Sequence, residues 1–470
     1  MAYTGFITTL KNVHKHPNAD RLLLAECFGN QVVVSTDYTE GQLGVYFPSD
    51  GQLCQEFCEI NNLLRKKDEN GNNVGGYMDE RRRVTAVKLR GEKSDGLFLP
   101  LTSLANFTTI SDLHEGDTIS VLNGVEICKK YIPKHNTGSW HGSSRKKVKV
   151  NFAPTFYEHV DTDQLAYHLG DFRAGDVVEL TLKMHGTSGR TGYLPLVKEK
   201  KRTLFHKIFR KHPGTYTEYG YVTGTRRVVL DDKHDGGFYA DNQFRHEMAK
   251  KFEGKLHKGE VVYYEIVGFV NENTPIMSSC DNKKIKDKEF VKQYGDTTVF
   301  SYGCNPYGDW EVSSAAPDVL AMDEIIKPKC KVYVYRMAVV NEDGNVYELS
   351  PTQMRLRCEQ MGVKCVPVFE TFMIPDDHLT IDEIYEDGFK THLTTPGEYV
   401  LHKVEQYFDG PDPIGKTHIR EGVVARIVNR PNIAVYKHKN FNFKVLEGII
   451  KDTADAPDME EEQEIINELS

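Results

Sequence analysis

The sequence predicts an α+β protein in which a small β-barrel precedes a larger domain of mixed strands and helices. The chain has 470 residues, enough for two or three domains with substantial cores. In roughly the first 130 residues, short apolar runs alternate with Gly, Asn and Asp, a pattern typical of small barrels. Farther along, longer strand-like runs alternate with helical stretches, which favours an α+β domain.

Each predicted element follows from a local pattern of side chains. In the amino-terminal part, apolar and β-branched runs predict strands at 31–35, 43–47, 84–91 and 96–100. In the larger part, longer runs of the same kind predict strands at 176–184, 261–270, 331–340 and 421–428. Apolar residues at helical spacing predict helices at 241–252 and 394–408. The second of these helices has Pro396 in its first turn, where the missing N–H of proline is tolerated.

Composition along the chain predicts the domain boundaries. We expect the barrel over 1–134, a linker over 135–150, the α+β domain over 151–451 and an acidic tail over 452–470. The linker is polar and rich in Gly and Ser. The tail has eight acidic residues and no basic residue, as solvated tails do. Removing those eight charges from the net charge of −9 leaves the rest of the chain at −1.

Two basic segments stand out in this nearly neutral body. One is RKKVK at 145–149, and the other is KEKKRTLFHKIFRKH at 198–212, with seven Lys or Arg residues against one Glu. Two interpretations stay open, namely a solvent-exposed charged face or a surface for the phosphate backbone of a nucleic acid.

Other features indicate the class and compartment of the protein. The nine cysteines include no CxxC pair, which argues against a structural zinc site or a disulfide framework. Cys54 and Cys58 have helical spacing and are expected only to pack. The amino terminus lacks signal-peptide features, and no apolar run approaches the roughly 18 residues of a membrane span. We expect no membrane partner and an intracellular, cytoplasmic location, or the host cytoplasm if the protein is viral.

The stretch TLKMHGTSGR places a single lysine, Lys183, at the end of an apolar strand-like run. A lysine can act as a covalent nucleophile, but only when it is unprotonated and its lone pair is available. Gly186 follows closely, and a glycine allows a phosphate or sugar to approach the backbone. The pattern Lys-x-[Asp/His]-Gly is that of nucleotidyltransferases with a lysyl-nucleotide intermediate. By itself this short pattern has low specificity.

Further along the chain, other candidates follow in order. Glu265 and Glu421 lie on strand-like runs, and a carboxylate can hold a hard divalent cation. Tyr335 offers an aromatic face for a purine. Lys437 and Lys439 are two residues apart on a predicted strand, so both point to one face, where they could neutralise triphosphate charge.

YVTGTRRVVL supplies Arg226 and Arg227, either of which could bind a phosphate bidentately; Arg226 is our choice. Each candidate also has an ordinary explanation as an exposed or core side chain. Only their joint order favours a functional site.

This ordered series resembles motifs I, Ia, III, IIIa, IV and V of the covalent nucleotidyltransferase superfamily. The segments concerned are KMHG, TGTRR, YEIVG, VYVYR, EGVVAR and YKHKN. The histidine at 185, in place of the usual aspartate, and the asparagine after Lys439 are similar to RNA-repair ligases. HPNADRLLLAE, GVYFPSDGQL, VKLRGEKSDGLFLP and YGDTTVFSYGCNPYG resemble segments of the Deinococcus- and Naegleria-type RNA ligases, which carry an amino-terminal OB domain. The resemblance runs from about residue 5 to residue 450.

The resemblance implies a nucleotidyltransferase, ATP-grasp-like ligase domain of antiparallel sheets with flanking helices, preceded by an OB-type β-barrel. It implies that Lys183 is the catalytic nucleophile and that Glu421 and Glu265 are metal ligands. ATP and Mg²⁺ or Mn²⁺ are the implied cofactors. The implied nucleotide-binding residues are His185, Gly186, Arg226, Glu265, Tyr335, Lys437 and Lys439.

The implied activity is ATP-dependent sealing of RNA ends that carry a 5′-phosphate and a 3′-hydroxyl, in a break or a nicked duplex. The order of domains agrees, since only 31 residues follow Lys439, too few for a second OB domain after motif V. Two departures are a long insertion between Glu265 and Glu421 and the basic segment 198–212, a candidate RNA-contacting addition. Two alternatives stay open: an OB-containing RNA-binding pseudo-ligase without turnover, and a guanylyl-transferring capping-type enzyme.

Overall fold

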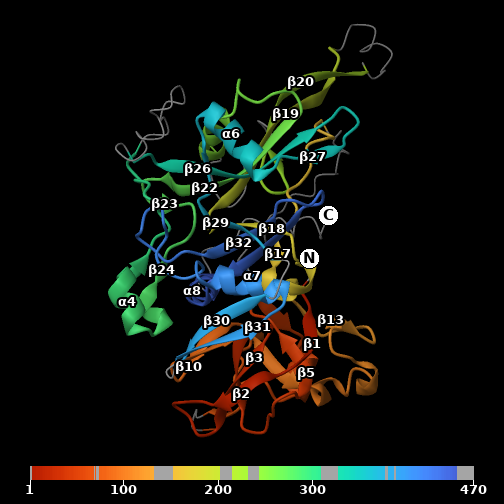
Figure 1. The fold of residues 1–470 in the computed structure, drawn as a ribbon, viewed down its shortest axis with the longest axis vertical. Helices are drawn as coiled ribbons and strands as arrows, with labels where there is room; N and C mark the ends of the chain where they lie inside the picture. Colours follow the sequence, from red (N-terminus) through yellow and green to blue (C-terminus); the bar gives the residue numbers. More distant parts are fainter. Residues whose placement is uncertain are drawn as a thin grey trace. The chain divides into compact units, whose positions relative to one another are not determined.

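The computed structural model describes residues 3–67, 69, 73–131, 152–201, 214–230, 243–308, 327–375, 379–385 and 388–452. Two compact units divide the chain (Figure 1). The amino-terminal unit contains Met1–Lys134 and Asn440–Ala454, and the central unit contains His135–Lys439. The predicted linker, the basic segment 145–149, residues 202–212 of the second basic segment and the tail beyond residue 452 lie outside the described residues.

The main sheet of the amino-terminal unit has four antiparallel strands in the order β12-β5-β1-β13. These strands are β1 (Gly5–Thr9), β5 (Leu43–Phe47), β12 (Leu97–Pro100) and β13 (Thr118–Ile119). A three-stranded sheet joins β2 (Lys11–Lys15), β3 (Leu22–Cys27) and β4 (Asn30–Ser35), and another joins β16 (Cys128–Lys130), β6 (Gly51–Leu53) and β9 (Arg83–Val84). The remaining described strands pair as β7 (Lys66–Lys67) with β8 (Asn73–Gly75), β10 (Ala86–Leu89) with β11 (Glu92–Asp95), and β14 (Val121–Leu122) with β15 (Val125–Glu126).

Apolar side chains from these strands and two helices close the amino-terminal unit. Helix α1 (Gln55–Ile60) buries Phe57 and Cys58, and Cys54 caps it, so Cys54 and Cys58 pack as expected. Helix α8 (Phe441–Asp452) packs on β10 and is held by the ion pair between Lys444 and Asp95. Helix α8 begins two residues after Lys439 yet belongs to the amino-terminal unit.

The central unit is built on two large sheets (Figure 1). The first has five strands in the order β17-β33-β32-β18-β29, namely β17 (Asp163–Gln164), β18 (Val177–Lys183), β29 (Val368–Met373), β32 (Gly422–Ile427) and β33 (Ala434–Lys439). The second follows the path β21-β20-β19-β22-β26-β27, namely β19 (Thr187–Glu199), β20 (Thr215–Gly224), β21 (Val229–Leu230), β22 (Glu260–Asn271), β26 (Cys330–Val340) and β27 (Val346–Glu348). Within the described residues, β23 (Thr274–Pro275) and β28 (Lys364–Cys365) extend it to eight strands, and β24 (Cys280–Asp281) with β25 (Thr297–Thr298), and β30 (Thr380–Tyr385) with β31 (Gly388–Leu393), form small ribbons.

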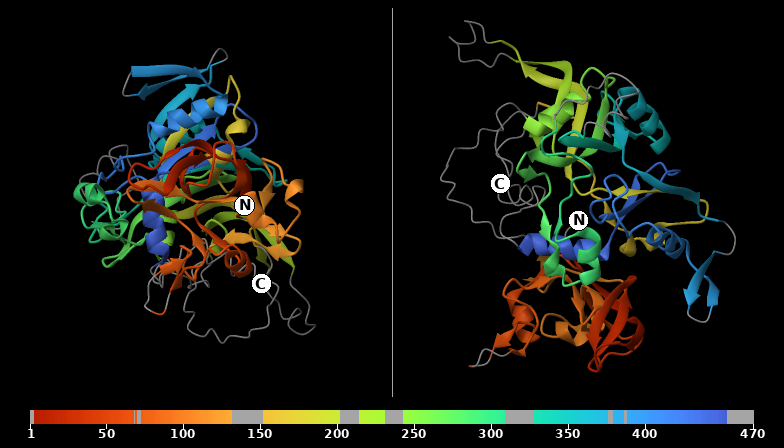
Figure 2. Two further views of the ribbon diagram at one scale, coloured as in Figure 1. Left: turned by 90° about the horizontal axis from the view of Figure 1, so that it is seen from below. Right: turned by 90° about the vertical axis from the view of Figure 1, so that its left-hand side faces the viewer.

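Helices cover these sheets because their apolar faces must be buried. Helices α3 (Gln243–Lys250) and α6 (Pro351–Met361) pack on one face of the eight-stranded sheet (Figure 2). Helix α7 (Pro396–Glu405) packs on the five-stranded sheet through Val400 and Val404. Pro396 lies in the first turn of α7, as expected, and a capping box of Thr395 and Glu398 begins the helix. Helix α4 (Lys288–Tyr294) lies in the segment between Glu265 and Glu421.

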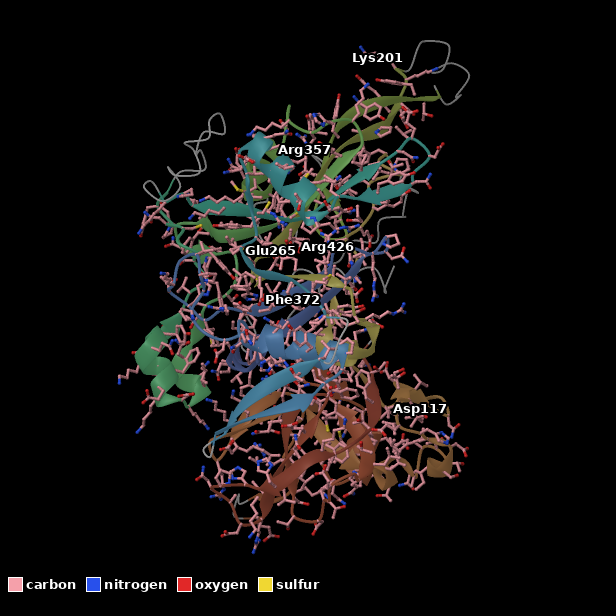
Figure 3. The ribbon with its side chains drawn as sticks, in the orientation of Figure 1. Asp117, Lys201, Glu265, Arg357, Phe372 and Arg426 are labelled. Atoms are coloured by element: carbon pink, nitrogen blue, oxygen red, sulfur yellow. The ribbon has the colours of Figure 1, made fainter. Side chains whose placement is uncertain are left out.

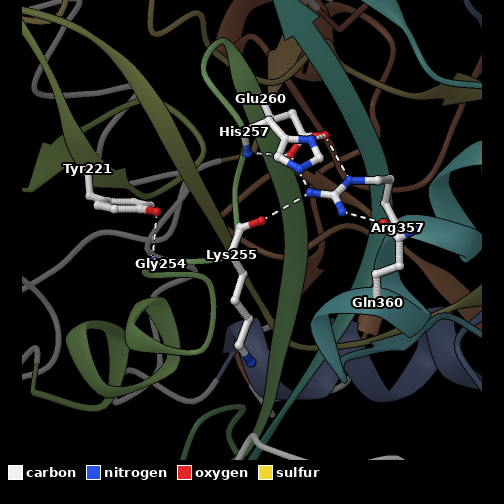
Figure 4. Close-up of polar contacts among 7 residues, drawn as sticks. All are labelled: Tyr221, Gly254, Lys255, His257, Glu260, Arg357 and Gln360. Carbon is white, nitrogen blue, oxygen red and sulfur yellow. Dashed lines mark hydrogen bonds and ion pairs between the residues drawn. The ribbon is translucent and has the colours of Figure 1, made fainter.

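Charged side chains fix the two sheets of the central unit to each other and to α6. On β32, Arg426 donates to the backbone oxygen of Leu349, just after β27, at 3.2 Å (Figure 3). On α6, Arg355 pairs with Glu179 of β18 at 2.7 Å. Arg357, also on α6, binds both carboxylate oxygens of Glu260 at the start of β22 (Figure 4). These contacts give the strand ends of the two sheets a defined relative position.

The structure contains the strands and helices expected from local patterns, with ends shifted by a few residues. The expected helix at 241–252 is α3, and the expected strand at 84–91 is divided into β9 and β10. The hairpin of β19 and β20 was not expected, because Gly192, Pro195 and Gly220 interrupt its alternation. Among the helices of the described ranges, none combines the length and the apolar character required to span a membrane.

Candidate active site

Lys183 lies at the point where the chain passes from one large sheet to the other. It is the last residue of β18 in the five-stranded sheet, and Thr187 begins β19 in the eight-stranded sheet. Gly186 in this crossing cannot be replaced without movement, since a Cβ there would lie 2.5 Å from the backbone oxygen of Ile266. The glycine therefore allows the crossing to lie directly against β22.

Strand register brings Lys183 beside Lys437 and Lys439. Gly422 of β32 is paired with Lys183 on one side and with Lys439 of β33 on the other. Lys437 is paired with Val424, two residues further along β32, so it lies on the same face as Lys439. Residues 183, 437 and 439 therefore share one face of the five-stranded sheet.

One buried carboxylate joins this cluster. The Oε1 atom of Glu421 lies 2.9 Å from Nζ of Lys183 and 3.3 Å from Nζ of Lys439. Its Oε2 atom lies 3.8 Å from Nδ1 of His185, and the Glu421 side chain is only 2% exposed. A carboxylate this deeply buried needs opposite charge around it, and the two ammonium groups supply it.

The Lys437 ammonium has a perturbed proton equilibrium. Burial, followed by the positive charges of Lys439, Lys183 and Arg226, lowers its pKa from 10.5 to about 8, while the charge of Glu421 opposes the shift. Lys437 therefore lies among the other cations of the cluster. Such a concentration of positive charge suits a polyphosphate ligand.

Arg226 and Arg227 lie in the turn after β20. Asp161 forms an ion pair with Arg226 and a longer contact, at 3.6 Å, with Arg227. The positive charge of Arg226 contributes to the lowered pKa of Lys437, so Arg226 lies within electrostatic reach of the lysine cluster. The sequence did not predict the ion pair between Asp161 and Arg226, because an isolated aspartate in a loop has no recognisable pattern around it.

Glu265 lies on β22 of the eight-stranded sheet (Figure 3). It is paired with Ser188 of β19, whose hydroxyl lies 3.4 Å from Oε2 of Glu265. A Cβ at Gly186 would lie 2.8 Å from Cγ of Glu265, so the glycine and this carboxylate are in close contact. Glu265 is therefore near the turn that carries His185, on the eight-stranded sheet.

Tyr335 lies further along the same sheet, on β26. Its ring centroid is 5.1 Å from that of His159, which also lies 5.5 Å from the ring of Tyr263. The cross-strand partner of Glu265 on β26 is Tyr333, one alternation away from Tyr335. His159 and Tyr333 are thus two aromatic neighbours that the sequence reasoning did not identify.

The carboxylates of this site suit a hard divalent cation. Mg²⁺ and Mn²⁺ prefer oxygen ligands, and Mg²⁺ is commonly held by one or two carboxylates together with water and substrate phosphates. Glu421 and Glu265 have the right donor atoms for this. Within the described ranges, three or more His, Cys, Asp or Glu side chains do not gather into a group that could hold a metal ion.

Comparison with known proteins gives the fold. A model of an OB-fold domain matches residues 5–101. A structure of a Naegleria gruberi RNA ligase mutant with AMP and Mn matches 94% of this chain and 98% of its own, at 15% identity and a TM-score of 0.53. The same RNA ligase with PPi matches 93% and 97%, at 15% identity and a TM-score of 0.51. No curated protein matches the sequence.

These matches confirm the predicted fold class. The described strands of the amino-terminal unit form several small sheets, and the OB-fold match covers most of them. The match to the Naegleria RNA ligase covers nearly the whole of both chains, so the similarity of fold includes the central unit. The resemblance named from the motifs is therefore confirmed at the level of the fold: this chain has the two-part fold of the Naegleria RNA ligase, with an amino-terminal OB-fold domain.

Proposed function

We propose that this protein is an ATP-dependent RNA ligase that acts through a covalent lysyl-AMP. The observation that carries the proposal is the contact of Lys183 with buried Glu421, beside Lys439 in the same row of the sheet. This arrangement places the candidate nucleophile Lys183 next to a carboxylate, Glu421, that can bind a divalent cation, and next to an ammonium group, Lys439, that can bind phosphate. The fold of the Naegleria RNA ligase, with structures in complex with ATP, AMP and Mn, supports the same class of reaction.

The first step forms a phosphoramidate. The unprotonated Nζ of Lys183 attacks the α-phosphorus of ATP, the N–P bond forms, and the bond from that phosphorus to the pyrophosphate oxygen breaks. One of the two protons on Nζ leaves to solvent or to a neighbouring base, and the other stays on the N–H of the phosphoramidate. Lys437 and Lys439 stabilise the charge on the phosphate oxygens, and Arg226 binds phosphate or ribose.

The next two steps join RNA. A 5′-phosphate oxygen of the RNA displaces Lys183 from the adenylate, which restores the lysine and forms an RNA-adenylate. A 3′-hydroxyl then attacks the 5′-phosphate, and AMP leaves. Throughout, the protein acts by in-line positioning and neutralisation of charge.

The remaining assignments concern the nucleotide and the metal. We assign His185 and Glu265 to the ribose side of the nucleotide, Gly186 to close approach of the backbone, and Tyr335 to stacking on adenine. Mg²⁺ or Mn²⁺ would be held by Glu421, with Glu265 as the second carboxylate, and would polarise the α-phosphate when bound.

The test is covalent labelling with α-labelled ATP. The wild-type protein should retain label after denaturation, and the label should be released by acid as expected for a phosphoramidate. Lys183→Ala should abolish it. Lys403→Ala is the matched control, since Lys403 makes a 2.9 Å pair with Glu370 on the same sheet and lies outside the cluster. Label at the wild-type level in the Lys183→Ala protein would disprove the assignment.

The same assay separates the alternatives. Labelling by GTP in place of ATP would indicate a capping-type guanylyl transfer. Binding of ATP without any covalent label would indicate a pseudo-ligase that keeps the pocket and has lost turnover. Comparing nicked duplexes with RNA or DNA on the 3′-hydroxyl side then identifies the substrate, and we expect preference for RNA at that position.

A further inference from the structure

Two loops of the central unit meet behind the turn that carries His185. They are residues 300–304 and 412–418, named here the Tyr302 loop pair. A Cβ at Gly415 would lie 2.7 Å from the backbone nitrogen of Gly303, so the two backbones are in direct contact. The hydroxyls of Ser301 and Thr417 add a hydrogen bond of 3.2 Å between the loops.

Tyr302 links this loop pair to the candidate active site. Its hydroxyl accepts the backbone N–H of His185 at 2.7 Å, and the residue is 1% exposed. Its ring packs edge-on against His418 at 4.6 Å. Phe300 reaches the same two histidines, at 4.6 Å from the His185 ring and 5.2 Å from the His418 ring. Tyr302 and Phe300 therefore connect the turn after Lys183 with the loop 412–418.

The loop 412–418 is shaped by two fully buried polar residues. Asp412 accepts the backbone N–H groups of Ile414 and Gly415 at 3.1 and 2.6 Å through Oδ2, and His418 bonds the backbone oxygen of Ile419 at 2.9 Å through Nδ1. In the described part of the chain, Oδ1 of Asp412 and Nε2 of His418 have no hydrogen-bond partner. These hydrogen bonds fix the backbone of the loop 412–418, which precedes Glu421 in the chain.

Sheet register does not explain the positions of His185 and Glu421. Lys183 is the last residue of β18, and Glu421 comes one residue before β32, so His185 and Glu421 both lie beyond the paired strands. The hydroxyl of Tyr302 accepts the backbone N–H of His185. The loop 412–418 precedes Glu421 in the chain by a few residues. The Tyr302 loop pair therefore constrains the positions of His185 and Glu421 beyond the ends of the paired strands.

We propose that Tyr302 is a positioning residue for adenylylation of Lys183, acting through the His185 amide and the loop 412–418, which precedes Glu421. This inference rests on the function proposed above and deepens it. Displacement of reacting groups by about 1 Å can cost roughly 100-fold in rate. The Tyr302 hydroxyl does not exchange protons in this role: burial keeps its pKa well above the ordinary value, and the carboxylates facing it are those of Asp412, Glu421 and Glu265.

The first experiment compares Tyr302→Phe with the wild type in single-turnover formation of lysyl-AMP. Loss of the hydroxyl should lower the maximal rate by about 10- to 100-fold and leave the ATP concentration at half-maximal rate within about twofold. The ratio of wild-type to variant rate should be constant from pH 6.5 to 9. A variant rate within twofold of wild type overturns the proposal. A rate ratio that changes tenfold with pH overturns it too, in favour of proton transfer by Tyr302.

The second experiment uses Gly415→Ala, which pushes the two loops apart without touching the hydroxyl. If both changes act by freeing the His185 amide, the double variant should be no more than about threefold slower than the slower single variant. Fully multiplicative losses would overturn the shared cause. Hydrogen exchange of a peptide containing His185 gives an independent readout, with at least tenfold faster exchange of that amide expected in both variants. Unchanged exchange in both would also overturn the proposal.

Tyr264→Phe is the matched control. Tyr264 is equally buried, and its hydroxyl lies 2.9 Å from that of Thr191, away from the Lys183 turn. It should melt at a reduced temperature comparable with that of Tyr302→Phe and adenylylate at the wild-type rate. An unlabelled wild-type protein would disprove the proposed function, whereas a labelled wild type with an equally fast Tyr302→Phe variant would disprove only the role of Tyr302.

Discussion

The ammonium of Lys183 and the carboxylate of Glu421 are 2.9 Å apart, although 238 positions separate them in the sequence. The antiparallel pairing of β18 with β32 places Lys183 opposite Gly422, the residue that follows Glu421, and so brings the two segments together. Lys439 joins from β33 and shares the same carboxylate oxygen. Three groups therefore meet at one end of three adjacent strands: the candidate nucleophile Lys183, the carboxylate of Glu421, which can bind a divalent cation, and the ammonium of Lys439, which can bind phosphate.

Replacing Glu421 should affect the reaction more than the fold. Glu421→Gln keeps the size of the side chain and removes the charge that Lys183 and Lys439 share. We expect lysyl-AMP formation to fall by at least 100-fold, about 2.7 kcal/mol of activation free energy. The rate is measured with α-labelled ATP under single-turnover conditions.

Glu370→Gln serves as its control, because Glu370 of β29 forms a 2.9 Å pair with Lys403 of helix α7, outside the cluster. It should change the rate by less than twofold. Equal losses in the two variants would show that the charge at Glu421 has no special role.

Lys437 should make stability depend on pH in the alkaline range. Its pKa is about 8 in the folded protein and 10.5 when unperturbed, so between these values the unfolded state binds more protons. The free energy of unfolding should therefore rise with pH from about 8 to 10, by up to roughly 3 kcal/mol, relative to Lys437→Gln. Urea unfolding of both proteins at pH 7.5, 8.5 and 9.5 measures this difference. A difference that stays constant would contradict the lowered pKa.

Deprotonation of Lys437 should also weaken the binding of AMP as the pH rises. A phosphate binds the protonated ammonium, so the affinity of the wild-type protein for AMP should fall several-fold between pH 7.5 and 9. Lys437→Arg remains charged throughout this range and should lose this dependence. Calorimetric titration with AMP measures it, and an identical fall in both proteins would assign the titration to another group.

Arg226 and Arg227 should differ sharply. Arg226 pairs with Asp161 and acts on Lys437, whereas Arg227 reaches Asp161 only at 3.6 Å. Arg226→Lys loses bidentate geometry and should weaken ATP binding by about tenfold or more. Arg227→Lys should stay within about twofold. The reverse order in an equilibrium binding assay would transfer the phosphate contact to Arg227.

Gly186 should be required for its lack of a side chain. An added Cβ would meet the backbone oxygen of Ile266 at 2.5 Å and Cγ of Glu265 at 2.8 Å, so Gly186→Ala must shift the crossing that carries Lys183. Adenylylation should fall by about 100-fold with only a modest loss of melting temperature. At Gly170 a Cβ would meet no heavy atom within 4 Å, so Gly170→Ala should behave as wild type. Wild-type rates for both variants would contradict the close approach at Gly186.

Local patterns were sufficient for the strands that carry the site. The alternation of AVYKHK puts Lys437 and Lys439 on one face, and β33 has them there. The apolar run before Lys183 predicts a strand that ends near that lysine, and β18 ends at it. Such features depend only on the two-residue period of a strand, which the chain carries wherever it folds.

Residue roles that depend on neighbours far away in the sequence could not be predicted from local patterns. RR in a turn gives no ground for choosing between Arg226 and Arg227, because their difference comes from Asp161 and Lys437. Tyr302 could not be identified, since its importance arises from a hydrogen bond to a backbone amide 117 positions away. A backbone N–H has no signature in the amino-acid sequence.

The sequence by itself determined the kinds of side chains available, their order, and the strand ends on which Lys183, Lys437 and Lys439 lie. Only the tertiary structure decided that Glu421 is buried against two of those lysines and that Tyr302 holds the turn between the sheets. The physical reason is that strand periodicity is a local property of the chain. Burial, charge pairing and backbone hydrogen bonds depend on which distant segments the packed sheets bring into contact.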